Sequence, residues 1–186
     1  MGLDPSSQAA LLGAVPGLRA FAVSLCGSAD RSDDLVQETL VRGIANIDSF
    51  TPGTNMAAWL TTILRNCFLN ECRHRSHETE DPKGSYVDTL TSQPAQEGHL
   101  QLAEFRAALL KLPIEQREAL ILIGGEGRSY DDAAEICRCA VGTVKSRTNR
   151  ARARLAELLS VESADDLGPD RAIHAALCAD NLRWAA

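Results

Sequence analysis

The stretch from Ser129 to Leu159, SYDDAAEICRCAVGTVKSRTNRARARLAELL, decides how the rest of the chain is interpreted. It predicts two short helices joined by a tight turn. The second helix carries only basic charges between Ile136 and Ala156: Lys145, Arg147, Arg150, Arg152 and Arg154. The whole chain has 186 residues and a formal net charge of -6. An acidic chain with one basic helix concentrates positive potential where phosphates can bind.

On a helical wheel, at about 100° per residue, this second helix separates into two faces. The predicted packed face comprises Val144, Thr148, Ala151, Leu155 and Leu158. The opposite side presents hydrogen-bond donors, and with Lys145 the predicted DNA-binding set is Thr143, Lys145, Ser146, Arg147, Asn149 and Arg150. Arg suits guanine edges and phosphates, Asn suits adenine, and Ser and Thr suit either. The alternative is a solvated basic surface, which usually has interleaved acids.

The first helix of the pair has a predicted start at Ser129. Ser129 can cap the helix, and Asp132 three residues later completes a capping-box arrangement. Ala133 and Ala134 are small enough for two helices to cross closely. The two helices therefore read as a helix-turn-helix.

Upstream, spacings of three and four predict further helices, and strand patterns are nearly absent. Gln8–Leu25 is helical with an interruption at Pro16, and the next helix begins at Asp33 with Ser32 as its cap. Its predicted inner side is Leu35, Leu40, Ile44 and Ile47. Residues 48–55 form a loop, and a long helix follows over about 56–75. The predicted interior stripe of that helix is Trp59, Leu60, Ile63, Leu64, Phe68 and Leu69.

The pattern predicts an all-α protein with two small helical domains, at residues 8–76 and 100–159. In the second domain, Phe105, Leu109 and Leu112 share a helix face, and a further helix runs from Glu115 to Ile123. From Ser76 to Glu104 there are six acids and one base, so residues 77–99 are expected to be a flexible acidic linker. Residues 160–186 form a C-terminal tail.

Composition argues against several other classes of protein. No apolar run is expected to reach the length of a membrane span, and the N-terminus lacks a basic signal-peptide region, so a cytoplasmic location is expected. The six cysteines fit none of the usual zinc spacings, and buried free thiols are the favoured reading. No His, Cys or acid cluster forms a plausible catalytic set. We expect no enzyme activity, no cofactor, no metal and no small-molecule substrate.

Three segments then carry a family resemblance over about residues 8–159. GTVKSRTNRARARL, preceded by LPIEQREALIL, resembles region 4 of bacterial extracytoplasmic-function (ECF) sigma factors. DDLVQETLVRGIANIDSF resembles their region 2 helix that binds the RNA polymerase core, and NMAAWLTTILRNCFLNECRHR resembles the helix that engages the minus-ten promoter element. FTPGTNMAAWL, YDDAAEIC and CAVGTVKSR are most similar to the general-stress-response, EcfG-like subgroup.

The resemblance implies a role for each segment. Residues 8–76 match sigma region 2 and residues 100–159 match region 4, whose helix-turn-helix would read the minus-thirty-five element. The implied core polymerase contacts are Asp33, Asp34, Gln37, Glu38 and Arg42. The implied minus-ten contacts are Asn55, Trp59, Arg65, Asn66, Asn70, Arg73 and Arg75. For Trp59, a core position is the favoured alternative, and Arg65 could equally pair with an acid of the neighbouring helix.

The implied partners are the RNA polymerase core enzyme, promoter DNA and a NepR-like anti-sigma factor. The implied function is promoter-specific initiation at general stress response genes. The alternative is a sigma-like decoy that binds an anti-sigma factor without initiating transcription. Three positions depart from the family pattern: Arg138 replaces a common Gly, Ala140 a common capping Ser, and Thr148 an aliphatic residue.

Overall fold

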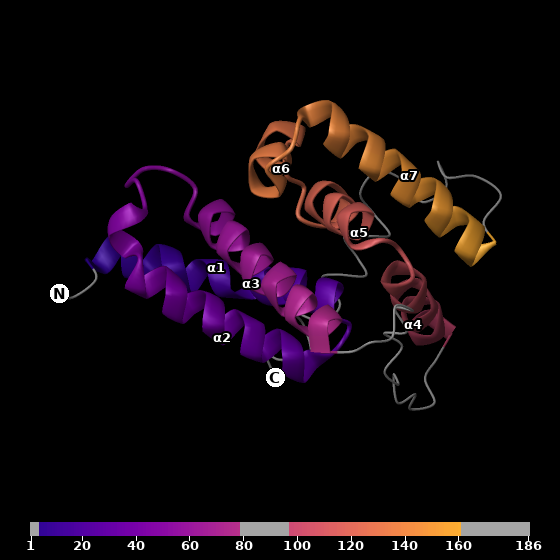
Figure 1. The fold of residues 1–186 in the computed structure, drawn as a ribbon, viewed down its shortest axis with the longest axis horizontal. Coiled ribbons are helices and arrows are strands. Elements are labelled where there is room, and N and C mark those ends of the chain that lie inside the picture. Colours follow the sequence, from indigo (N-terminus) through magenta and orange to yellow (C-terminus); the bar gives the residue numbers. More distant parts are fainter. Residues whose placement is uncertain (1–3, 79–96, 161–186) are drawn as a thin grey trace. The chain divides into compact units, whose positions relative to one another are not determined.

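The computed structural model describes residues 4–78 and 97–160, and within those ranges the chain forms seven α-helices and no strand. The chain divides into two units, Met1–Tyr86 and Val87–Ala186 (Figure 1). The predicted all-helical fold with two small domains is therefore confirmed. The expected acidic linker falls mostly on residues 79–96 and the tail on residues 161–186, which lie outside the described residues.

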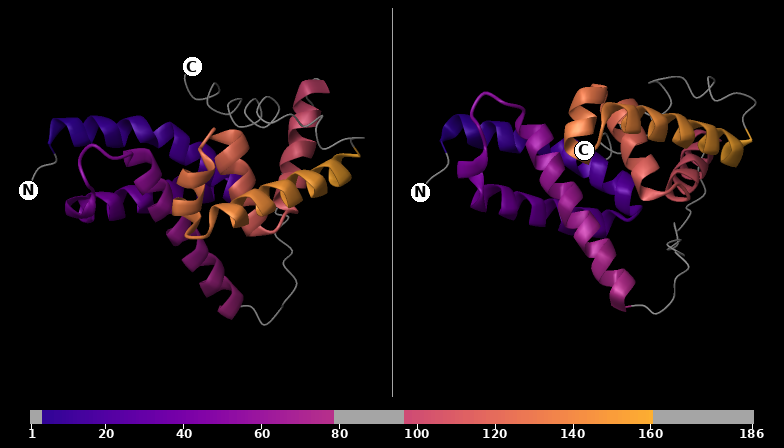
Figure 2. Two further views of the ribbon diagram at one scale, coloured as in Figure 1. Left: turned by 90° about the horizontal axis from the view of Figure 1, so that it is seen from above. Right: turned by 45° about the horizontal axis from the view of Figure 1, so that its top comes forward.

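The first unit is a bundle of α1 (Pro5–Cys26), α2 (Ala29–Ala45) and α3 (Met56–Glu78), in which each helix packs on the other two (Figure 1). A 3-10 turn at Ile47–Ser49 follows α2. The C-terminal end of α3 continues past the ends of α1 and α2 (Figure 2). That end of α3 is therefore open to solvent on more than one side, as its exposed Arg73 and His74 indicate.

Two predictions about α1 are wrong. Pro16 lies inside one continuous helix instead of interrupting it. A proline lacks the N–H that would bond the carbonyl four residues earlier, and its ring crowds that carbonyl. Both Pro16 and Leu12, which carries that carbonyl, lie on the exposed side of α1. The packing of the buried side is therefore undisturbed. The second prediction was that no apolar run reaches the length of a membrane span. By length and composition alone α1 does reach it, with a window of mean hydropathy 1.7. Its buried residues, among them Leu18 and Phe21, pack as in a core helix.

α2 begins earlier and is rotated relative to its prediction. Its N-cap is Ser28, and Ser32 is buried inside the helix with its hydroxyl donating to the Ser28 carbonyl. The buried residues are Ser32, Leu35, Val36, Thr39 and Gly43, whereas Ile44 is 46% exposed. The physical reason is Gly43, where an added Cβ would lie 2.8 Å from Leu60 Cδ2. The missing side chain lets α3 approach closely, and this turns Ile44 outward.

The predicted interior stripe of α3 is confirmed at Leu60, Leu64 and Phe68, which are buried. Trp59, Ile63 and Leu69 are half-buried, and Met56, Thr61 and Cys67 are buried instead. The Thr61 hydroxyl donates to the Ala57 carbonyl at 2.8 Å, which satisfies it inside the bundle.

The second unit consists of α4 (Glu97–Leu110), α5 (Ile114–Leu120), a π-helical turn (Ile121–Gly125), α6 (Tyr130–Cys137) and α7 (Val141–Leu159). α7 packs against α4, α5 and α6. The predicted face of Phe105, Leu109 and Leu112 is buried, as expected. The predicted helix Glu115–Ile123 is present, but its last residues wind into the π-helical turn.

A buried arginine joins α4 to α5. Arg117 Nη2 donates to the carbonyls of Leu110, at 2.6 Å, and Leu112, at 3.0 Å. These carbonyls lie at the end of α4, where helical partners run out. The arginine therefore supplies the C-terminal hydrogen bonds that α4 lacks and fixes the direction in which α5 leaves.

Candidate nucleic-acid interface

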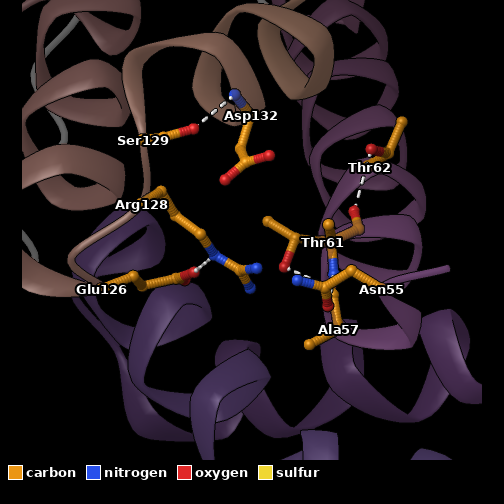
Figure 3. A network of polar contacts seen from close by, with 9 residues as sticks. Asn55, Ala57, Thr61, Thr62, Glu126, Arg128, Ser129 and Asp132 are labelled. Atoms are coloured by element: carbon orange, nitrogen blue, oxygen red, sulfur yellow. Dashed lines mark hydrogen bonds and ion pairs between the residues drawn. The ribbon is translucent and has the colours of Figure 1, made fainter.

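The helix-turn-helix consists of α6, the residues after it and α7. Ser129 caps α6, because its hydroxyl accepts the Asp132 N–H at 3.0 Å (Figure 3), as predicted. Just upstream, Arg128 Nε donates to Glu126 Oε2 at 2.8 Å (Figure 3). Burial raises the pKa of Glu126, and the neighbouring Arg128 offsets part of that rise. The cap and the ion pair fix the loop from which α6 starts.

The turn between α6 and α7 is closed by backbone hydrogen bonds. The N–H of Arg138 donates to Glu135 O and the N–H of Cys139 to Ala134 O, each at 3.1 Å. This is the Schellman arrangement, with Arg138 in the left-handed conformation at φ 51°. The turn requires a positive φ, which glycine adopts without strain. Arginine at position 138, where the family commonly has glycine, therefore strains the backbone of this turn.

The packed face of α7 is confirmed with one exception. Val144, Thr148, Ala151 and Leu155 are fully buried, and the Thr148 hydroxyl donates to the Val144 carbonyl at 2.9 Å. The internal hydrogen bond explains how a threonine fits an apolar face. Leu158, which the wheel also placed there, is 37% exposed, and Ala156 is buried instead. The prediction for Leu158 is wrong because the buried side of the last turn shifts toward Ala156, away from the face that the wheel predicted.

The other face of α7 presents the predicted donors. Lys145, Asn149 and Arg150 are exposed, and Thr143, Ser146 and Arg147 are half-buried. Two cations lie against neighbouring residues: Lys145 Nζ is 5.5 Å from the centre of the Tyr130 ring, and Arg147 Nη1 is 3.8 Å from Cys139 Sγ. Their positions relative to the helix are therefore partly set before any ligand binds. Assignment of these six residues to DNA remains a prediction.

α7 begins without a side-chain cap. Ala140 occupies the N-cap position with φ -67° and ψ 147°, and no side chain bonds the first turn. Those angles are the ones a capping serine adopts. Because alanine replaces the common serine at this position, the first turn of α7 lacks a side-chain capping hydrogen bond.

A second predicted interface lies at the loop before α3 and along that helix. Asn55 caps α3 with its side-chain carbonyl, which accepts the Ala58 N–H at 3.1 Å. Its assignment to a base of the minus-ten element remains a prediction. Trp59 is half-buried and packs on Phe50 with ring centroids 5.4 Å apart, so it lies between the core and stacking roles that the sequence left open. The loop and the start of α3 are thus joined by an aromatic pair.

The remaining residues predicted for this interface follow one helix. Arg65 and Asn66 are half-buried, and Asn70 and Arg73 are exposed, with Arg73 Nη1 donating to Asn70 Oδ1 at 3.2 Å. Arg75 pairs with Glu71, which also pairs with Arg31 of α2 at 3.2 Å. Arg75 is therefore engaged within the bundle as well as being part of this predicted set.

The predicted polymerase contacts all lie on α2. Asp34, Gln37, Glu38 and Arg42 are exposed, with Glu38 and Arg42 paired at 2.6 Å. Asp33 is held by Arg19 of α1 at 2.6 Å. Two apolar residues lie on the same exposed side: Val41, 67% exposed, was not among the predicted contacts, and Ile44, 46% exposed, was predicted to face the core. The run of i, i+3 and i+4 spacings from Asp34 through Gln37 and Glu38 to Val41 could have identified this mixed acidic and apolar face.

Comparisons with known proteins agree on both units. The family profile "Sigma-70 region 2" matches residues 14–78, and "Sigma-70, region 4" matches residues 102–155. The chain is 61% identical to the ECF RNA polymerase sigma factor EcfG of Rhodopseudomonas palustris, over 95% of this chain and 98% of that protein. It is 36% identical to the ECF RNA polymerase sigma factor SigC of Mycobacterium tuberculosis, over 73% and 72% of the two chains.

One solved structure is similar over most of both chains. The sigma factor RpoE of Bartonella quintana, solved in complex with the anti-sigma factor NepR, has a TM-score of 0.72 and 52% sequence identity to this chain. The match covers 82% of this chain and 96% of RpoE.

Proposed function

The chain belongs to the extracytoplasmic-function (ECF) family of RNA polymerase sigma factors, and from this membership we propose how its two units divide promoter recognition. The second unit places α7 in the major groove of the minus-thirty-five element. The first unit engages the minus-ten element through the loop before α3 and α3 itself. α2 docks on the polymerase core. The protein is an initiation subunit and not an enzyme, and we expect it in the cytoplasm with the polymerase.

The two-sided character of α7 carries the proposal for the second unit. Fully buried Val144 and Leu155 hold the helix on α4, α5 and α6, so its opposite side cannot turn inward. That side offers Lys145, Asn149 and Arg150 to solvent with no acid among them. A rigid helix with a donor-rich outer face is what direct readout of base edges requires.

The exposed side of α2 supports the proposal for polymerase binding. Apolar Val41 and Ile44 lie on the same exposed side of α2 as the polar side chains of Asp34, Gln37 and Glu38. Exposed apolar groups rimmed by polar ones are a common mark of protein interfaces. We assign Asp34, Gln37 and Glu38 to the rim of this surface and Val41 and Ile44 to its centre.

We assign a NepR-like anti-sigma factor as the regulatory partner. RpoE of Bartonella quintana, 52% identical in sequence to this chain, was solved with NepR. The general stress response is the matching biological role, supported by 61% identity to a protein named EcfG. Binding of such a partner to the surfaces that meet polymerase would keep the sigma factor from the core enzyme.

Run-off transcription tests the proposed function against the decoy alternative. Purified chain is mixed with core polymerase and a stress-response promoter, and a NepR-like protein is then added. A specific product that the NepR-like protein suppresses is the expected result. Binding of the NepR-like protein without any transcript would instead identify a decoy. Suppression without loss of polymerase binding would contradict the competition mechanism.

A further inference from the structure

Arg138 occupies a position that the fold alone does not favour for arginine. It is the left-handed residue of the Schellman turn, with φ 51° and ψ 49°. A side chain at such angles crowds the backbone, and glycine is the usual solution. The only other non-glycine residue with positive φ in the described part of the chain is Ser160, at the end of α7. Among the described non-glycine residues, positive φ is thus confined to the turn before α7 and the end of α7.

Among the residues that the structure describes, the side chain of Arg138 gains no compensating contact. The residue is exposed, and within residues 4–78 and 97–160 its guanidinium has no hydrogen-bond or ion-pair partner. Two other arginines of the same unit are engaged, Arg117 with backbone carbonyls and Arg128 with Glu126, whereas Arg150 on the predicted reading face is exposed like Arg138. The charge at position 138 is therefore presented to solvent at a cost in backbone strain.

The location of this charge indicates what it binds. Arg138 precedes Cys139, whose sulfur lies 3.8 Å from Arg147 Nη1 on the predicted reading face. In a helix-turn-helix, the start of the second helix enters the groove and the flanking residues meet the sugar-phosphate backbone. We propose that the guanidinium of Arg138 binds a backbone phosphate of the minus-thirty-five element. This inference rests on the proposed role of α7.

A contact within the protein is the competing explanation. Glu135 is exposed and lies three residues earlier, where an ion pair with Arg138 could form on the last turn of α6. A pair of this kind would stabilise α6 and would not involve DNA. The two explanations make opposite predictions for Glu135→Gln, because loss of an acid beside DNA does not weaken the binding of phosphate.

The test uses full-length chain bound to core polymerase and a promoter fragment on which the wild-type holoenzyme gives a run-off product. Promoter affinity is measured between 50 and 200 mM salt for wild type, Arg138→Asn, Arg138→Gly, Arg138→Lys and Glu135→Gln. Thermal unfolding of each free chain is measured in parallel. Asn tolerates the left-handed conformation and Gly favours it, so neither replacement is expected to unfold the turn.

Arg138→Asn and Arg138→Gly are expected to bind promoter more weakly at low salt while unfolding at the wild-type temperature or above. Their salt slope should fall by about 0.9, so that the change from 50 to 200 mM costs them about 3.5-fold less affinity than wild type. Arg138→Lys and Glu135→Gln should keep the wild-type slope.

An unchanged slope and affinity in Arg138→Asn would overturn the phosphate contact. Equal weakening by Glu135→Gln and Arg138→Asn would also overturn it, in favour of the ion pair. Failure of the proposed function is a separate result, because it appears as absence of a run-off product with the wild-type holoenzyme.

Discussion

Arg19 of α1 and Asp33 of α2 form an ion pair with 2.6 Å between Nη2 and Oδ2. Both side chains are partly exposed, at 30% and 41%. The pair ties the two helices together close to the surface that we assign to polymerase. It also engages one of the carboxylates that the sequence offered as a direct polymerase contact.

The first prediction concerns this pair. Arg19→Gln and Asp33→Asn should each destabilise the chain by no more than about 1 kcal/mol, because partly exposed ion pairs contribute little. If Asp33 acts through Arg19, both variants should reduce affinity for core polymerase equally, and the double variant should add nothing further. Chemical denaturation and equilibrium binding measure the two effects. A further loss on adding Asp33→Asn to Arg19→Gln would show that Asp33 contacts polymerase itself.

The second prediction concerns the apolar centre of the α2 surface. Val41→Ser with Ile44→Ser should weaken core polymerase binding by at least tenfold, about 1.4 kcal/mol, because apolar contacts at the centre of an interface are lost. Stability should change little, since both side chains are exposed in the free chain. Leu12→Ser on α1 is the matched control, because Leu12 is 62% exposed but lies off this surface. Equal effects of the two variants on binding would refute the assignment.

The third prediction concerns the reading face of α7. Arg147→Ala with Arg150→Ala should abolish promoter-specific transcription, because two charge-assisted contacts to bases or phosphates are removed. Binding to core polymerase should remain, since α7 is not part of the α2 surface. Lys111→Ala removes an exposed positive charge elsewhere in the same unit and should transcribe normally. Transcription that persists in the double variant would sink the assignment of this face.

The fourth prediction concerns the uncapped start of α7. Ala140→Ser should stabilise the second unit by about 1 kcal/mol, because the backbone at 140 already has capping angles and a hydroxyl can accept a first-turn N–H. Ala153→Ser, on the exposed side in the middle of α7, is the control and should be neutral or slightly destabilising. Thermal unfolding of the two variants is the measurement. A lack of difference between them would mean that the first turn is satisfied in another way.

The fifth prediction concerns the close approach of α2 and α3. Gly43→Ala should destabilise the first unit by about 1–3 kcal/mol, because the new methyl group would overlap Leu60, which is fully buried. Gly13→Ala on α1 meets nothing within 4 Å and should stabilise by about 0.5–1 kcal/mol. Urea unfolding of both variants provides the comparison. Stabilisation by Gly43→Ala would show that α2 and α3 can separate at no cost.

Periodicity predicted the helices well where one face is apolar and continuous. The buried set Val144, Thr148, Ala151 and Leu155 follows directly from the spacing of α7. Prediction failed where a small residue decides the packing, as at Gly43, because a wheel of hydrophobic residues gives no weight to glycine. The rotation of α2 that exposes Ile44 is therefore visible only with α3 in place.

The candidate site shows the same division. The basic face of α7 and the cap at Ser129 depend on local sequence and were predicted. The pairing of Asp33 with Arg19 depends on which neighbour the fold supplies, whereas the cap at Asn55 is local and was missed because its amide was assigned to a base. Residue type alone indicated polar contacts at these positions, but it could not distinguish an external partner from an internal one.

The buried Arg117 has a mechanical consequence. Any pulling force that reaches the second unit from the preceding chain enters it through α4, whose end is fastened by two hydrogen bonds from one guanidinium to Leu110 and Leu112. Both bonds come from the same nitrogen of Arg117, so the loss of this one side chain would remove both. Under tension, for example when both units hold one promoter, this side chain would share the load with the buried face of α4 that packs on α7.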